Sequence, residues 1–171
     1  MQIFHHGIKS YLPEFVYGSI DGTVTTFAII AGIAGADLSS SIVLILGFSN
    51  VLADGFSMAS SNYLSEESHQ AQVEGNHTAP WKTAFATFIS FITIGSMPLV
   101  AYVISYLYPG SISDEFRVAS ILTLLTFFFI GLVRGKVADT SLFKAALQTC
   151  FIGLVAALVA YGVGAWLKGL V

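Results

Sequence analysis

The sequence has little charge and a single cysteine. Only 10% of its 171 residues are charged, whereas soluble domains carry about 25%, and the mean hydropathy is +0.78. The lone Cys150 excludes an intramolecular disulfide framework. A net charge of -3 without a basic patch excludes nucleic-acid binding, because nothing would neutralise the phosphates. The first residues lack the basic start and cleavage site of a secretory signal, so we expect the first helix to be retained.

Long apolar segments dominate the chain and predict an integral membrane protein. A helix needs roughly 20 apolar residues to cross a hydrocarbon core about 30 Å thick. The runs are continuous rather than alternating, which excludes a β-barrel. We therefore predict an all-α, polytopic fold, a single transmembrane domain over residues 1–171 with a short acidic cytoplasmic loop at about 65–80. The five expected helices span about 15–36, 41–64, 83–107, 116–133 and 145–167.

The basic residues are divided unevenly between the two ends of such a bundle. An odd number of spans puts five of the seven Lys and Arg residues on the side of the N-terminus. By the positive-inside rule, this distribution predicts a cytoplasmic N-terminus and a C-terminus outside the cell or in a lumen. The five are Lys9, Lys82, Arg134, Lys136 and Lys144, and the other two are Arg117 and Lys168.

Positive charge is missing from the first two predicted helices, since no Lys or Arg lies between Lys9 and Lys82. The same stretch places Asp21 and Asp54 inside the membrane. An ionised carboxylate there costs at least about 2.5 kcal/mol, so each must be protonated, hydrogen-bonded, solvated or bound to a cation. These states indicate ion or proton transport. The alternative is that either acid is a neutral packing residue, or that it pairs with a cation of a later helix. Those later cations are Arg134 and Lys144.

Polar side chains recur every four residues along the second predicted helix. Asn50, Asp54, Met58 and Asn62 follow this spacing, which continues to Glu66. Each step of four turns only about 40° around an α-helix, so these side chains form one slowly turning stripe. Oxygen ligands alone would suit Mg²⁺ or Ca²⁺, whereas a thioether among them suits a softer ion such as Fe²⁺. The stripe is a plausible cation path, although a membrane methionine can also serve only to pack the core.

The first predicted helix carries acids and glycines at helical spacing. Glu14, Asp21 and Thr25 share one face, and Gly18 and Gly22 flank the aspartate. Small residues four apart let two helix backbones approach closely, so a homodimer seam here would bring two copies of Asp21 together. Alternatively, the glycines pack helix one against helix two of the same chain. Two further glycines open to the same interpretation are Gly32 and Gly35.

Three blocks of the sequence follow one another in order: DGTVTTFAIIAGIAGA (21–36), GFSNVLADGFSMASSNYLSEES (47–68) and PWKTAFATFISFITIGSMPLVAY (80–102). Together they resemble the vacuolar iron transporter family, including its many bacterial members. The resemblance implies a dimeric five-helix transporter that moves Fe²⁺, often also Mn²⁺, out of the cytoplasm in exchange for protons. It implies that Asp21 and Met58 contact the ion on a path lined by helices one and two. For this short chain we expect a bacterial plasma membrane.

Two features depart from that family. Many members have Gly-Glu-Tyr-Leu where this chain has Ser61, Asn62, Tyr63 and Leu64, so one carboxylate becomes an amide. Other members carry a large cytoplasmic metal-collecting domain where this chain has only the loop at about 65–80. The metal-capable residues of that loop form a shared loading site or serve only solubility, and they are Glu66, Glu67, His69, Glu74 and His77. The predicted metal contacts are Asp21, Asp54, Met58, Asn62, Glu66 and Glu67, with Glu14, Thr25 and Asn50 along the path.

Other classes of function leave different signatures. A proton-coupled carrier of small solutes would use the same acids without binding metal. A membrane scaffold would use the acids and glycines only to pack helices. The absence of HExxH and GxSxG motifs and of a Cys/His pair argues against an enzyme, and we expect no resident cofactor.

Overall fold

The fold is a helical bundle in which five helices are long and apolar enough to cross a membrane. The structure is a computed structural model and describes residues 11–72 and 79–170, which contain helices and connections without strands. This result confirms the all-α, five-span prediction. In chain order the elements are α2 (Leu12–Gly35), α3 (Ser40–Gln70), α4 (Pro80–Gly95), the 3₁₀ turn η1 (Met97–Leu99), α5 (Val100–Leu107), α6 (Glu115–Val137) and α7 (Leu142–Lys168).

Two differences from the sequence prediction go beyond shifts of a few residues at helix ends. Helix α3 continues to Gln70, so the first residues of the expected loop at 65–80 are helical, because nothing there breaks a helix and Gln70 Nε2 donates to Glu66 Oε1 at 2.9 Å. The third span is interrupted at η1, because Pro98 lacks the N–H that an α-helix would need. Residues Glu74 and His77 lie outside the described residues.

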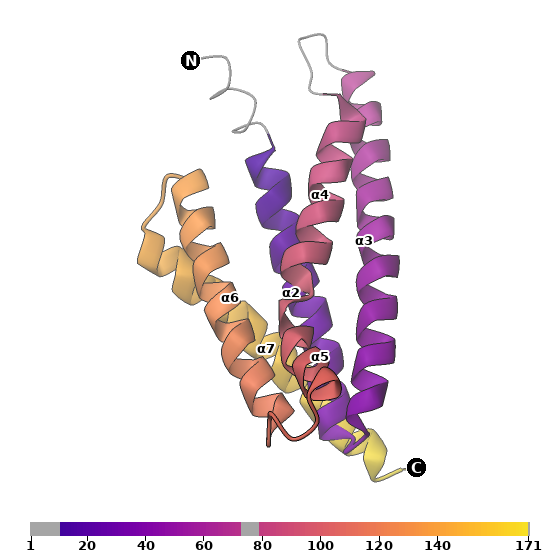
Figure 1. Ribbon diagram of the computed structural model, residues 1–171. Helices are drawn as coiled ribbons and strands as arrows, with labels where there is room; N and C mark the ends of the chain where they lie inside the picture. The colour runs from indigo at the N-terminus through magenta and orange to yellow at the C-terminus, as the bar shows by residue number, and fades with distance from the viewer. Residues whose placement is uncertain (1–10, 73–78, 171) are drawn as a thin grey trace.

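Helix α2 begins at one end of the bundle, and α7 finishes at the other (Figure 1). The connections at 36–39 and 108–114 lie at the α7 end, whereas the 138–141 turn lies at the end where α2 begins. The Lys and Arg residues that the structure describes are divided between the same two ends of the bundle. Which end faces the cytoplasm stays a prediction. Those at the α2 start are Lys82, Arg134, Lys136 and Lys144, and those at the other end are Arg117 and Lys168.

Helix α2 is the centre of the bundle and contacts all four of the other spans. Its glycines set two of these contacts. A Cβ added at Gly22 would lie 2.8 Å from the carbonyl oxygen of Phe91 on α4, and Gly18 likewise faces α4. Further along, Gly32 and Gly35 face α7. The glycines therefore meet α4 and α7 of the same chain rather than helix two, and a homodimer through helix one stays a prediction.

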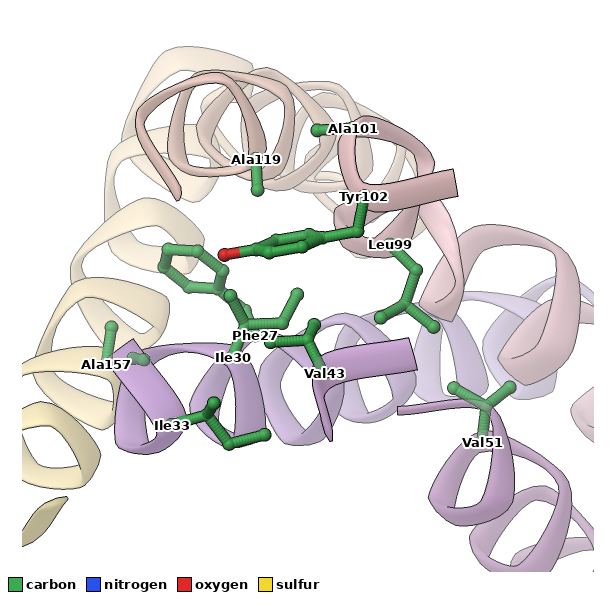
Figure 2. Close-up of a cluster of buried hydrophobic side chains, with 11 residues drawn as sticks. Phe27, Ile30, Ile33, Val43, Val51, Leu99, Ala101, Tyr102, Ala119 and Ala157 are labelled. Carbon is green, nitrogen blue, oxygen red and sulfur yellow. The ribbon is translucent and has the colours of Figure 1, made fainter. Parts of the chain in front are cut away.

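The largest cluster of buried apolar side chains lies toward the α2–α3 connection (Figure 2). There Ile30 and Val43 meet Leu99 of η1 and Tyr102 of α5. Glu115 of α6 links α3 and α5 at the same end of the bundle, since its carboxylate accepts hydrogen bonds from Ser40 Oγ at 2.7 Å and Ser105 Oγ at 2.6 Å. The other half of the bundle is more open, because the α6–α7 hairpin leans away from α2 and α4 there (Figure 1).

We predict that Gly22→Ala destabilises the protein by ~1–3 kcal/mol, because the new methyl group must push α4 away. Thermal unfolding of the purified protein in detergent measures the loss. The matched control is Gly162→Ala on α7, where no atom lies within 4 Å of the added Cβ. A change in oligomer mass without a change in melting temperature would contradict packing within one chain.

Candidate metal path along α2 and α3

The short connection between α2 and α3 fixes the relative depth of their side chains. Both helices rise about 1.5 Å per residue. A residue that lies n positions before Gly35 on α2 is therefore at nearly the same depth as the residue n positions after Ser40 on α3. This register sets Thr25 level with Asn50. Two further levels follow in the same way toward the start of α2, namely Asp21 with Asp54, and Glu14 with Ser61, the residue next to Asn62.

Asp21 and Asp54 lie near enough for the charge of Asp54 to act on Asp21, in agreement with this register. Both are partly buried, and neither forms an ion pair, because the one ion pair among the described residues joins Lys168 to Asp37 at 2.8 Å. The guanidinium of Arg134 instead meets Thr149. Among the described residues the two aspartates therefore have no basic partner, and the charge of Asp54 acts on Asp21.

The four-residue stripe of α3 has its own internal hydrogen bonds. Asn50 Nδ2 donates to Asp54 Oδ2 at 2.7 Å, which orients the carboxylate along the helix. The stripe runs between a buried row facing α4, such as Gly55, and an exposed row of small residues, such as Ala53. Met58 lies in this half-buried stripe, so its thioether is reachable from the α2–α3 face.

A second pair of oxygens lies closer to the start of α2. Glu14 Oε2 and Asn62 Oδ1 are both buried and have no hydrogen-bond partner. A buried acceptor without a donor is costly, so two of them at one depth favour a cation or a proton there. The sequence placed both residues near the path but did not pair them. Counting residues from the α2–α3 connection would have found this pair.

The remaining predicted residues are less closely grouped. Thr25 Oγ1 donates to the carbonyl oxygen of Asp21 at 3.0 Å, which leaves only its lone pairs for a ligand. Glu66 continues the stripe and is partly buried, whereas Glu67 is exposed beside it. Among residues 11–72 and 79–170, no three His, Cys, Asp or Glu side chains come together as a metal site. A complete coordination shell would need Met58, amide or backbone oxygens, water, or a second copy.

The sequence model of the VIT family matches residues 12–78 and 66–165, which together cover most of the chain. The chain belongs to the VIT family. Its relatives include a vacuolar iron transporter of Toxoplasma gondii, 26% identical over 94% of this chain and 75% of that protein. Vacuolar iron transporter 1 of Arabidopsis thaliana is 25% identical over 92% of this chain and 88% of that protein.

These relatives contain residues that this VIT family chain lacks. The Toxoplasma gondii alignment runs over 227 positions, more than the 171 residues present here. The two matched segments of the family model meet at 66–78, where α3 ends and the connection to α4 begins. This is the place where the sequence predicted a missing cytoplasmic domain. The relatives named here are eukaryotic, so a bacterial plasma membrane stays a prediction.

We predict that Asp54→Asn raises the melting temperature of the metal-free protein, because it removes the like charge facing Asp21. The same variant should lose most of the additional stability that Fe²⁺ or Mn²⁺ gives the unaltered protein, measured by thermal unfolding with and without metal. Asp139→Asn is the control, since Asp139 is exposed in the 138–141 turn and asparagine tolerates its positive φ of 52°. Equal metal stabilisation of both variants would contradict a site at Asp54.

Proposed function

We propose that this chain transports Fe²⁺, and also Mn²⁺, out of the cytoplasm in exchange for protons. The observation that carries the proposal is the pair Asp21 and Asp54, at matching depths on α2 and α3 and without a basic partner among the described residues. Such a pair favours a divalent cation, which compensates both charges at once. Relatives named vacuolar iron transporters along most of the chain support iron as that cation.

The proposed route follows the polar levels of α2 and α3 in order of depth. The hydrated ion enters past Glu66 and Glu67 on the last turns of α3. It first meets the unpartnered oxygens of Glu14 and Asn62. Seven residues further along α2, or about 10 Å, it exchanges water for Asp21 and Asp54, with Met58 adding a sulfur ligand. Release follows past Thr25 and Asn50 toward the end where α7 finishes.

Protons complete the proposed cycle. Once the metal leaves, two facing carboxylates in the membrane are too costly to remain ionised and empty. Protons from the side of release neutralise them and reset the path. Metal and proton thus compete for the same oxygens, and this competition couples their movements in opposite directions.

We propose that two copies together enclose this path. The α3 stripe is only half-buried, and the exposed row beside it carries small side chains such as Ala53 and Ser57, which let another helix approach closely. On α2, Tyr17 is 61% exposed one turn from Asp21. A second copy covering this face would shield the acids from lipid and supply the missing ligands. Light scattering in detergent should give twice the chain mass, and a monomer that transports would contradict the proposal.

Asp21→Asn should reduce Fe²⁺ transport by at least about tenfold, because the variant loses one of the two facing negative charges that hold the ion. Uptake of Fe²⁺ into proteoliposomes, with an outwardly or inwardly directed pH gradient, measures both transport and its coupling. Asp139→Asn should transport normally. Normal Fe²⁺ transport by Asp21→Asn would contradict the proposed function and favour a scaffold, whereas proton-coupled uptake without metal binding would favour a carrier of other solutes.

Met58→Leu should change metal preference more than total transport, because leucine keeps the volume and removes the thioether. The Fe²⁺/Mn²⁺ transport ratio should fall, since a softer ion gains more from sulfur. Competition between the two metals in the same proteoliposomes gives this ratio directly. An unchanged ratio would show that Met58 only packs the helix.

A further inference from the structure

The side chain of Asn50 is held by Asp54, four residues further along α3. Its Nδ2 donates to Asp54 Oδ2 at 2.7 Å. An ionised carboxylate only accepts hydrogen bonds, so the nitrogen of the amide rather than its oxygen must face the carboxylate. Among residues 11–72 and 79–170 no other group donates to Asp54, which leaves Oδ1 free for a ligand. The two oxygens of this carboxylate are therefore not equivalent.

The directions of the side chains show from which side an ion can reach the free oxygen. Side chains on a helix lean toward its N-terminus, and α3 begins at the end of the bundle where α7 finishes. Asp54 therefore leans toward Asn50, and the thioether of Met58 leans toward Asp54. Helix α2 runs the opposite way, so Asp21, at the level of Asp54, leans toward the level of Met58.

These directions favour one position for a cation over another. An ion between the levels of Asp54 and Met58 meets a free carboxylate oxygen, a thioether and the side chain of Asp21. An ion between Asp54 and Asn50 would instead face the N–H groups of the amide, whose hydrogens carry partial positive charge and repel a cation. The side of Asp54 turned toward Met58 is thus the binding side.

We propose that Asn50 is a positioning residue and not a ligand: its amide holds Asp54 Oδ2, so that Oδ1 binds the ion together with Asp21 and Met58. This inference rests on the proposed metal path and assigns one residue of that path a different role. A carboxylate fixed by a hydrogen bond presents its free oxygen in one orientation, which a ligand for a metal ion requires.

Titration of the purified full chain with Mn²⁺, with free Mn²⁺ measured by electron paramagnetic resonance, tests this role. Asn50→Leu keeps the volume but removes the donor, and it should weaken Mn²⁺ binding about tenfold. Asn50→Gln should stay within about twofold of the unaltered protein, because a glutamine amide can still donate to a carboxylate four residues on. Combined with Asp54→Ala, Asn50→Leu should change the affinity less than about twofold, since no carboxylate remains to be positioned.

Ser60→Ala is the matched control on the same helix, since the Ser60 hydroxyl donates to the backbone carbonyl oxygen of Phe56 at 2.8 Å, and it should bind Mn²⁺ normally. Equal losses in Asn50→Leu and Asn50→Gln would overturn the proposal, because a ligand oxygen displaced by one methylene would be lost in both. An effect of Asn50→Leu that persists beside Asp54→Ala would overturn it too, as would an unchanged affinity of Asn50→Leu.

The comparison of Asn50→Leu with Asn50→Gln decides the question even where Asp54→Ala binds Mn²⁺ too weakly to measure. Failure of the unaltered protein to bind Mn²⁺ is a separate outcome, since it would contradict the proposed function itself and the role of Asn50 with it.

Discussion

The lack of a basic partner for Asp21 and Asp54 among the described residues is the constraint on which the rest of the structure depends. Two acids that interact through their charges, inside a membrane and without a base, destabilise the empty bundle unless something neutralises them. A purely structural role would be better served by an uncharged pair. The fold must therefore hold α2 and α3 together by contacts other than those between the acids, and the packing of α2 shows how.

Helix α2 divides its surface between packing and polar contacts. One face, with Gly18 and Gly22, lies against α4, and another, with Gly35, lies against α7. These close backbone contacts hold the helix from two sides, while Asp21 stays partly exposed. On the other side of the path, α3 is anchored by Gly47 against Leu99. The proposed path therefore runs beside the well-packed contacts between the helices and does not interrupt them.

Much of this arrangement can be predicted from the sequence, because the two signals that predict it, apolar runs and residue spacing, are local. Continuous apolar runs predict the spans, and the four-residue spacing of Asn50 and Asp54 predicts a stripe that the structure places on one half-buried face. Periodicity tells which residues share a face but not which helix that face meets, so the partners of Gly18 and Gly22 could not be read from it. The full length of α3 was missed for another reason, since its last turns are polar and extend beyond the apolar run.

The packed half of the bundle also restricts where an ion could leave. Beyond Thr25 and Asn50, the space between the helices is filled by Ile30, Val43 and Leu99, all at most 2% exposed. The hydrogen bonds that Glu115 accepts from α3 and α5 hold these helices and α6 together at that end of the bundle. An ion released from Asp21 and Asp54 therefore cannot continue through the interior of one chain. We infer that it moves along the open face of α2 and α3, which is the face that a second copy would cover. On this proposal transport and dimerisation are one requirement, because two copies together would enclose the route.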